Sequence, residues 1–218
     1  MSIYLNNAAT TWPKPPCVPD TIYDFIANRG ANVARGSASM RDIQSLDNVF
    51  TCRQKLAELL GGHQKCDPRF ITLTSNITES INIIIKGFLK PGMKAVTSSM
   101  EHNSVLRPLR RAESEGVALD IIQCSLKGYL DPDLMKKYLS EGADIAIINH
   151  CSNVCGSLQN IEDIAEVCRT SNVPLVVDCA QTAGIIKISA QDLGAAALCF
   201  TGHKGLFGPQ GTGGIVWD

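Results

Sequence analysis

The two residues best suited to chemistry in this sequence are a lysine and an acid. Lys204 lies in the glycine-flanked turn Thr201-Gly-His-Lys-Gly205, and Asp178 ends the apolar run Leu175-Val-Val-Asp178. Each comes at the carboxyl end of an expected buried strand, where open α/β sheets bind ligands. Pyridoxal 5'-phosphate (PLP) requires such a pair, because an amine holds it as a Schiff base and an acid keeps its ring nitrogen protonated. The alternative is an ordinary loop lysine and an acid that caps a turn.

A phosphate group could bind where residues 74–80 lead from a strand into a helix that begins near Thr78. The first N–H groups of a helix have no partner within it, and the positive end of the helix dipole lies there. Ile77 and Thr78 stand at this end, while Thr201 and His203 flank the lysine on the other side. The alternative is a capping box in the same segment. Both could hold, since caps and anion sites use the same donors.

Three more polar side chains follow expected strands and could reach the same ligand. His102 could stack on an aromatic cofactor and move protons, although a lone histidine is more often structural. Asn153 could reach ring substituents, and Gln181 could donate its amide to the phenolic oxygen of PLP. Five strand ends thus each carry a residue that could face the same ligand. Such an arrangement is hard to explain by coincidence.

From residue 70 onward, short β-branched runs alternate with helical periodicity, which predicts a doubly wound α/β domain. The expected strands are 69–73, 95–98, 118–123, 144–149, 174–177, 197–201 and 213–217. The expected helices are 20–28, 45–60, 78–89, 105–116, 132–140 and 161–171. The proline-rich residues 11–16 should form an extended arm. We expect residues 1–68 to form an arm with helices, and residues 69–218 to form the PLP-binding large domain.

Composition argues against several kinds of partner. The 218 residues are 44% hydrophobic and carry a net charge of −1, which suits one globular core and gives no field that favours nucleic acid or an anionic membrane. The apolar runs are far shorter than a membrane span, and the first residues lack the pattern of a signal peptide. We therefore expect a cytoplasmic protein that binds neither nucleic acid nor membrane.

The nine cysteines are scattered and form no CxxC pair. Four fall on expected apolar faces or strand-like segments: Cys124, Cys168, Cys179 and Cys199. Free cysteine in such places behaves as a small hydrophobic residue, so we expect a reduced protein. His150, Cys151 and Cys155 fit no common zinc spacing and have no evident fourth ligand. We therefore expect no metal site there.

Five motifs stand out as a set. They are Tyr4-Leu-Asn-Asn-Ala-Ala-Thr-Thr-Trp-Pro-Lys-Pro15, Thr78-Glu-Ser80, Glu101-His-Asn-Ser-Val-Leu106, Asp178-Cys-Ala-Gln-Thr-Ala-Gly184 and Thr201-Gly-His-Lys-Gly-Leu-Phe-Gly-Pro-Gln-Gly211. Together they resemble class V aminotransferases, and most closely the cysteine desulfurase and selenocysteine lyase group. The resemblance implies fold type I of PLP enzymes, a three-layer α-β-α domain with a mostly parallel seven-stranded sheet. It also implies a homodimer with active sites at the subunit boundary.

The resemblance also assigns roles to individual residues. It makes Lys204 the Schiff-base lysine, Asp178 the partner of the pyridine nitrogen and His102 the ring-stacking residue, and these three are the expected catalytic residues. Gln181 becomes the donor to the phenolic oxygen, and Asn153 a contact of cofactor or substrate. The implied phosphate ligands are Thr78, Thr201 and His203.

Departures from the family pattern leave the substrate open. Ile77, an expected cofactor contact, stands where many desulfurases have a small residue, and Val154 stands where they commonly have glutamate. Desulfurases also use a mobile cysteine and a carboxylate-binding arginine well beyond the PLP lysine, whereas this sequence stops at Asp218. We expect a counterpart of roughly the first half to two-thirds of such an enzyme, without the small C-terminal domain. It should bind PLP and at most exchange an α-proton or transaminate slowly.

The expected function is therefore that of a PLP enzyme acting on an amino acid, most similar to a cysteine desulfurase, with a sulfur-acceptor protein as a further partner. One alternative is an aminotransferase or another amino-acid lyase of the same class. A second alternative is a PLP-binding fragment without turnover.

Overall fold

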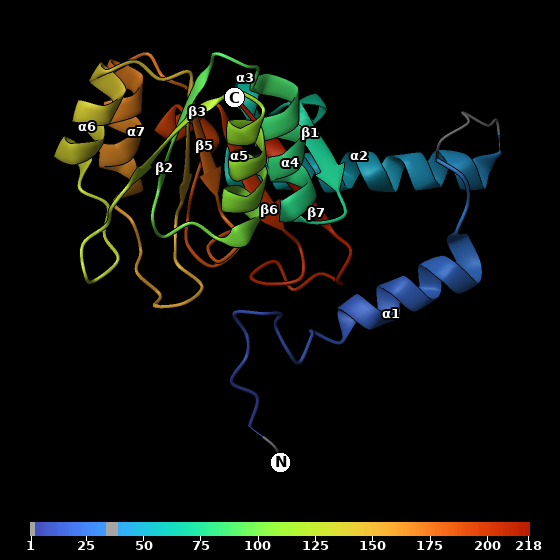
Figure 1. Ribbon diagram of the computed structural model, residues 1–218. Coiled ribbons are helices and arrows are strands. Elements are labelled where there is room, and N and C mark those ends of the chain that lie inside the picture. Colours follow the sequence, from blue (N-terminus) through green and yellow to red (C-terminus); the bar gives the residue numbers. More distant parts are fainter. Residues whose placement is uncertain (1–2, 34–38) are drawn as a thin grey trace.

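The computed structural model describes residues 3–33 and 39–218, and a seven-stranded sheet forms its centre (Figure 1). The strands are β1 (Ile71–Thr74), β2 (Lys94–Ser98), β3 (Ala118–Ile122), β4 (Ile145–Asn149), β5 (Leu175–Asp178), β6 (Ala197–Thr201) and β7 (Gly213–Trp217). Their order is β1-β7-β6-β5-β4-β2-β3. β7 is antiparallel to both neighbours, and the other adjacent strands are parallel. The mostly parallel sheet is confirmed, and each strand lies within two residues of its expected range.

Helices cover both faces of the sheet and complete a three-layer α-β-α arrangement (Figure 1). One face carries α4 (Ile77–Phe88) and α5 (Asn103–Ser114). The other carries α2 (Met40–Leu60), α6 (Pro132–Ser140), α7 (Ile161–Thr170) and α8 (Ala190–Leu193). α1 (Cys17–Asp24) continues into a π-helical turn at Phe25–Arg29, and α3 (His63–Cys66) with a 3-10 turn at Pro68–Phe70 leads into β1. Among the helices of the described residues, none is long and apolar enough to cross a bilayer.

The alternation of side chains along β4 shows how one sheet supplies two cores. Ile145 and Ile147 pack on the side of α4 and α5, whereas Ala146 and Ile148 pack on the side of α6 and α7. Successive side chains of a strand point to opposite faces, so a strand covered on both faces is apolar throughout. All five residues of β4 are buried. Burial of each isoleucine contributes about 1.5–3 kcal/mol, which holds the sheet rigid beneath its carboxyl edge.

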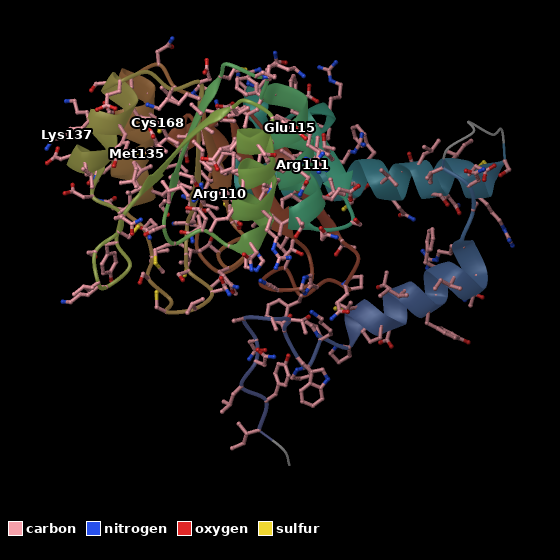
Figure 2. All side chains as sticks on the ribbon, in the orientation of Figure 1. Arg110, Arg111, Glu115, Met135, Lys137 and Cys168 are labelled. Carbon is pink, nitrogen blue, oxygen red and sulfur yellow. The ribbon has the colours of Figure 1, made fainter. Side chains whose placement is uncertain are left out.

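The predicted core cysteines lie where expected. Cys168, Cys179 and Cys199 are buried, and Cys124 packs half-buried against the same core as Cys168. Cys168 of α7 and Met135 of α6 both belong to the core between these helices and the sheet (Figure 2). Burial raises the pKa of the Cys168 thiol to about 12, which makes it unreactive. All nine cysteines lie within the described residues and are free thiols.

Two helices begin three or more residues earlier than the sequence predicted. α2 begins at Met40, where Ser39 caps it by accepting the N–H of Asp42, and not at residue 45. Met40 and Ile43 in its first turns are exposed, so no buried apolar face marks this start in the sequence. α1 likewise begins at Cys17 instead of residue 20, and none of its residues is buried.

Candidate active site

A cavity lies at the carboxyl edge of the sheet, beside the ends of β4 and β5 and the first turns of α4 and α5. The chain reaches this edge through segments that are far apart in sequence, since parallel strands all end there. Six of the nine predicted cofactor contacts line the cavity: Ile77, His102, Asn153, Asp178, Gln181 and Lys204.

Asp178 is a buried acid at the wall of this cavity. It is 4% exposed, and its Oδ1 accepts the N–H of Ala180 at 2.9 Å. Burial raises the pKa of Asp178, while the Ala180 N–H and the electrostatic influence of His102 and Lys204 oppose this shift. It forms no ion pair within the described residues. A buried acid of this kind is costly without a cation, and a ligand in the cavity could supply one.

Lys204 presents a half-buried amine to the same cavity. Burial lowers the pKa of its ammonium, and the negative charge of Asp178 opposes this shift. A lowered pKa increases the share of neutral amine, the form that attacks a carbonyl. The backbone of the turn is fixed, because the Lys204 carbonyl accepts the N–H of Phe207 at 2.9 Å and the hydroxyl of Thr11 at 3.0 Å.

The glycines of the lysine turn allow close packing that no other residue permits. A Cβ on Gly205 would lie 2.4 Å from the carbonyl oxygen of Ala183, and one on Gly202 would lie 2.2 Å from Thr212 Oγ1. The turn is therefore packed against the backbone of Ala183 on one side and against Thr212, the residue before β7, on the other. This packing fixes the backbone position of the turn and thereby limits the positions that the Lys204 side-chain amine can reach.

Gly205→Ala is expected to destabilise the protein by about 2 kcal/mol, because the added methyl group would overlap backbone that cannot rotate away. Gly87→Ala is the matched control, since its Cβ in α4 would meet nothing within 4 Å. The control should gain about 0.5–1 kcal/mol from the better helix propensity of alanine. Urea unfolding measures both changes. Equal stability of the two variants would contradict the close packing of the lysine turn.

His102 caps α5 at the rim of the cavity. Its Nδ1 accepts the backbone N–H of Ser104 at 3.1 Å and lies 2.8 Å from the Ser104 hydroxyl oxygen. An Nδ1 that accepts from the backbone leaves the proton of a neutral imidazole on Nε2. The cap therefore sets both the tautomer and the orientation of the ring, although the side chain itself is exposed.

α4 begins beside the cavity with a hydrogen-bonded cap. Asn76 Oδ1 accepts the N–H of Glu79 at 2.9 Å, and the Glu79 carboxylate accepts the N–H of Ser75 at 2.7 Å. The capping alternative expected for this segment therefore forms, with Asn76 as the cap. The N–H groups of Ile77 and Thr78 begin the helix and have no partner within it. An anion could bind them without displacing the cap.

Three predicted phosphate ligands lie outside the cavity wall. Thr78 is exposed in the groove between α4 and α5. Thr201 is buried, and its hydroxyl donates to the carbonyl of Thr212 at 3.3 Å. His203 is half-buried, and its Nδ1 is buried without a hydrogen-bond partner in the described part of the chain. Burial and two nearby lysines lower the pKa of His203.

The N-terminal arm packs on the lysine turn, a contact that the sequence did not predict. Thr11 donates its N–H to the carbonyl of His203 at 3.1 Å, and the Lys14 ammonium donates to the same oxygen at 2.7 Å. Gln181 donates its amide to the carbonyl of Ala8 at 3.0 Å. The arm thus holds the backbone of the turn from the side opposite the sheet.

Comparison with known proteins agrees with this arrangement. The family model described as aminotransferase class V matches residues 3–217. The chain belongs to the class V aminotransferase family. Cysteine desulfurase IscS from Pectobacterium carotovorum subsp. carotovorum is 33% identical over 220 residues, which cover 99% of this chain and 53% of that protein. IscS from Vibrio vulnificus shows the same identity and coverage. The chain therefore spans about half the length of the curated relatives it matches.

Solved structures share the fold of this chain. An apo cysteine desulfurase from Thermococcus onnurineus NA1 matches with a TM-score of 0.91 and 30% identity, over 99% of this chain and 53% of that one. A NifS-like protein matches with a TM-score of 0.90 and 26% identity, over 100% and 59% of the two chains. These matches confirm the expected three-layer fold.

Sequence reasoning missed polar residues at the cavity, Asn149 among them, and a further one behind it. Asn149 lines the cavity and lies opposite Asp178 in the register of β4 and β5. Asn149 ends an apolar strand just as Asp178 does, so the same signal could have found it. Glu101 is buried next to it and accepts its backbone N–H. No pattern in the sequence links these two residues, because their contact depends on the order of the strands.

Proposed function

We propose that this chain binds PLP in the cavity through Lys204 and acts on an amino acid, with a cysteine desulfurase-like reaction as the first candidate. The observation that best supports this is the meeting of the Lys204 amine and the buried acid Asp178 at one cavity. His102, the third predicted catalytic residue, lines the same cavity. Family membership supports the same assignment.

The chemistry of the side chains suits the ring of PLP. Asp178 has no cationic partner within the described residues, and a protonated ring nitrogen would compensate its buried charge. His102 at the rim could cover one face of the ring. Gln181 and Asn153, from the loops after β5 and β4, could reach its oxygen substituents. Gln181 would keep one amide proton for this contact, since its amide carries two and the arm takes one.

The phosphate of PLP would bind at the start of α4. The N–H groups of Ile77 and Thr78 and the hydroxyl of Thr78 offer donors there. His203 adds a buried ring nitrogen that lacks a partner in the described part of the chain. Thr201 would contribute only if its hydroxyl left the carbonyl of Thr212.

PLP, when bound, supplies an electron sink for the charge that develops at the α-carbon of an amino acid. Lys204 Nζ would hold the cofactor covalently and, once displaced by the substrate amine, would carry the α-proton. Burial lowers the pKa of Lys204, which favours the neutral amine that both tasks require. Asp178 would keep the proton on the ring nitrogen, and the packed turn around Lys204 would keep its Nζ within reach of the α-carbon.

Titration of the purified chain with PLP, followed by borohydride reduction, tests the proposal. We expect a visible absorption band and one reduced, labelled peptide that contains Lys204. Labelling confined to exposed lysines, without the band, would reject it. With L-cysteine, release of alanine and sulfide indicates a desulfurase, whereas a keto acid indicates an aminotransferase. Cofactor binding with no product at all would support the non-catalytic alternative.

We further propose that the chain forms a homodimer. α1 and the first half of α2 extend from the body of the molecule (Figure 1). These helices and the π-helical turn after α1 carry large apolar side chains that are 54–76% exposed: Tyr23, Ile26, Met40 and Phe50. Exposed large apolar and aromatic side chains are enriched at protein interfaces. Sedimentation velocity should give twice the chain mass, and a monomer at micromolar concentration would contradict this. A protein that accepts sulfur remains a proposed further partner.

A further inference from the structure

Glu101 is a buried carboxyl group behind the cavity. Its Oε1 accepts the hydroxyl of Ser98 at 2.7 Å and the backbone N–H of Asn149 at 3.1 Å. Its Oε2 is also buried, yet has no hydrogen-bond partner within the described residues. The residue is 8% exposed, so solvent does not satisfy this oxygen.

Asn149, whose backbone N–H donates to Glu101, carries a second unsatisfied atom. Its Nδ2 donates to the carbonyl of Met100, which determines the side of the amide on which the oxygen lies. Its Oδ1 is buried and receives no donor in the described part of the chain. An ionised Glu101 would leave two buried acceptors without a donor, which is costly. A proton on Glu101 Oε2 would convert one of these acceptors into a donor.

The charges around Glu101 also favour its neutral form. The charged group that acts on it is the acid Asp178, whose influence opposes ionisation. The basic side chains of the cavity, His102 and Lys204, act on Asp178. The partners of Glu101 on β2 and β4, Ser98 and Asn149, are both uncharged. Within the described residues, no cation pairs with Glu101.

We propose that Glu101 is a neutral carboxylic acid that donates its Oε2 proton to Asn149 Oδ1 and thereby positions Asn149 beside Asp178. The proton belongs on Oε2 because Oε1 already accepts two hydrogen bonds. The two buried oxygens that lacked a partner, Glu101 Oε2 and Asn149 Oδ1, then have one, and Asp178 is the acid left to face a cationic ligand. Glu101 is a positioning residue, since it reaches the cavity only through Asn149.

The ionisation of Glu101 agrees with this assignment. Burial raises its pKa to about 8, the charge of Asp178 adds to the shift, and the hydrogen bonds from Ser98 and Asn149 oppose it. The ordinary pKa is 4.5. The stability that the protonated group contributes is therefore complete below pH 4.5 and is lost as the pH rises to about 8. The protonation of Glu101 does not depend on the proposed function. The role of Glu101 in positioning Asn149 for a cofactor does rest on that function.

The test compares the apo wild-type chain with Glu101→Gln by urea unfolding. Glutamine has the same shape, and its amide can donate from the position of the proton. Between about pH 5.5 and 7.5, the unfolding constant of the wild type should rise about 100-fold more than that of the variant, because only the wild type must retain a proton that the unfolded chain has lost. Glu166→Gln, at an exposed position on α7, is the control and should follow the wild type.

Identical pH dependence of the wild type and Glu101→Gln would overturn the proposal. So would a Glu101→Gln variant as unstable as Glu101→Ala, because glutamine should replace the neutral donor. If the variants do not fold, infrared spectra of the wild type labelled with ¹³C-glutamate still decide. A carbonyl band of a protonated buried acid near pH 6.5, lost above about pH 9, is expected, and its absence contradicts the proposal.

PLP titration adds a readout that separates this inference from the proposed function. Glu101→Gln should bind PLP within about threefold of the wild type, whereas Glu101→Ala should bind more weakly because Asn149 loses its partner. If no form of the chain binds PLP, the proposed function fails, while the stability measurements still determine the state of Glu101. Tighter binding by Glu101→Ala than by Glu101→Gln would count against the positioning role.

Discussion

Lys204→Ala is expected to abolish the reduced PLP label in the cavity and to slow α-proton exchange about 10²–10⁴-fold. Lys204 contributes the amine that lines this cavity, so the variant loses both the covalent attachment and the proton carrier. Exchange can be followed by NMR as the loss of the α-proton of an amino acid in D₂O. Because burial lowers the pKa of Lys204, removing its ammonium should not destabilise the apo fold.

Lys187→Ala is the matched control for this experiment. Lys187 is exposed, and PLP also reacts with exposed amines, so the control measures nonspecific labelling. It should keep the visible band and the exchange rate of the wild type. A label that persists in Lys204→Ala but disappears in Lys187→Ala would place the covalent site elsewhere and contradict the proposed function.

The strand ends that carry the candidate site could be predicted because parallel sheets make them physically distinctive. Asp178 ends a buried apolar strand and Lys204 follows one by three residues. A charged side chain at such a place is costly unless it serves a ligand. The structure brings both to one cavity although they belong to different strands. The same reasoning applied to Asn149 would have added it to the candidate site. The local sequence was therefore sufficient to predict which polar residues at strand ends belong to the candidate site.

Contacts between distant segments could not be predicted from local patterns. Glu101 follows β2 and meets Asn149 of β4, because β2 and β4 are neighbours in the sheet although β3 lies between them in sequence. Thr11 meets the carbonyl of His203 across nearly the whole chain. Both contacts follow from strand order and from the path of the arm. Neither leaves a periodicity or composition signal in the residues that make it.

Asp178→Asn is expected to raise the stability of the apo protein. Burial raises the pKa of Asp178, so the stability that its protonated form contributes is complete below its ordinary pKa of 3.8 and is lost as the pH rises through the folded-state pKa. Asparagine keeps the shape and removes the charge. The apo variant should therefore be more stable than the wild type near neutral pH by about 1–2 kcal/mol. Urea unfolding at several pH values measures this difference, which should shrink toward acid pH.

The same Asp178→Asn substitution should reduce α-proton exchange while it increases the stability of the apo protein. An amide cannot hold the ring nitrogen of PLP in its protonated form, so α-proton exchange should fall about 10²–10³-fold. PLP should also raise the unfolding free energy of Asp178→Asn less than that of the wild type, since stabilisation follows affinity for the folded state. Asp133→Asn, at an exposed position on α6, should change neither quantity appreciably. A variant at residue 178 that is less stable at neutral pH and exchanges at the wild-type rate would show Asp178 to be a structural acid. Higher stability at neutral pH together with slower exchange would instead show that the charge of Asp178 destabilises the apo fold and serves a cationic ligand.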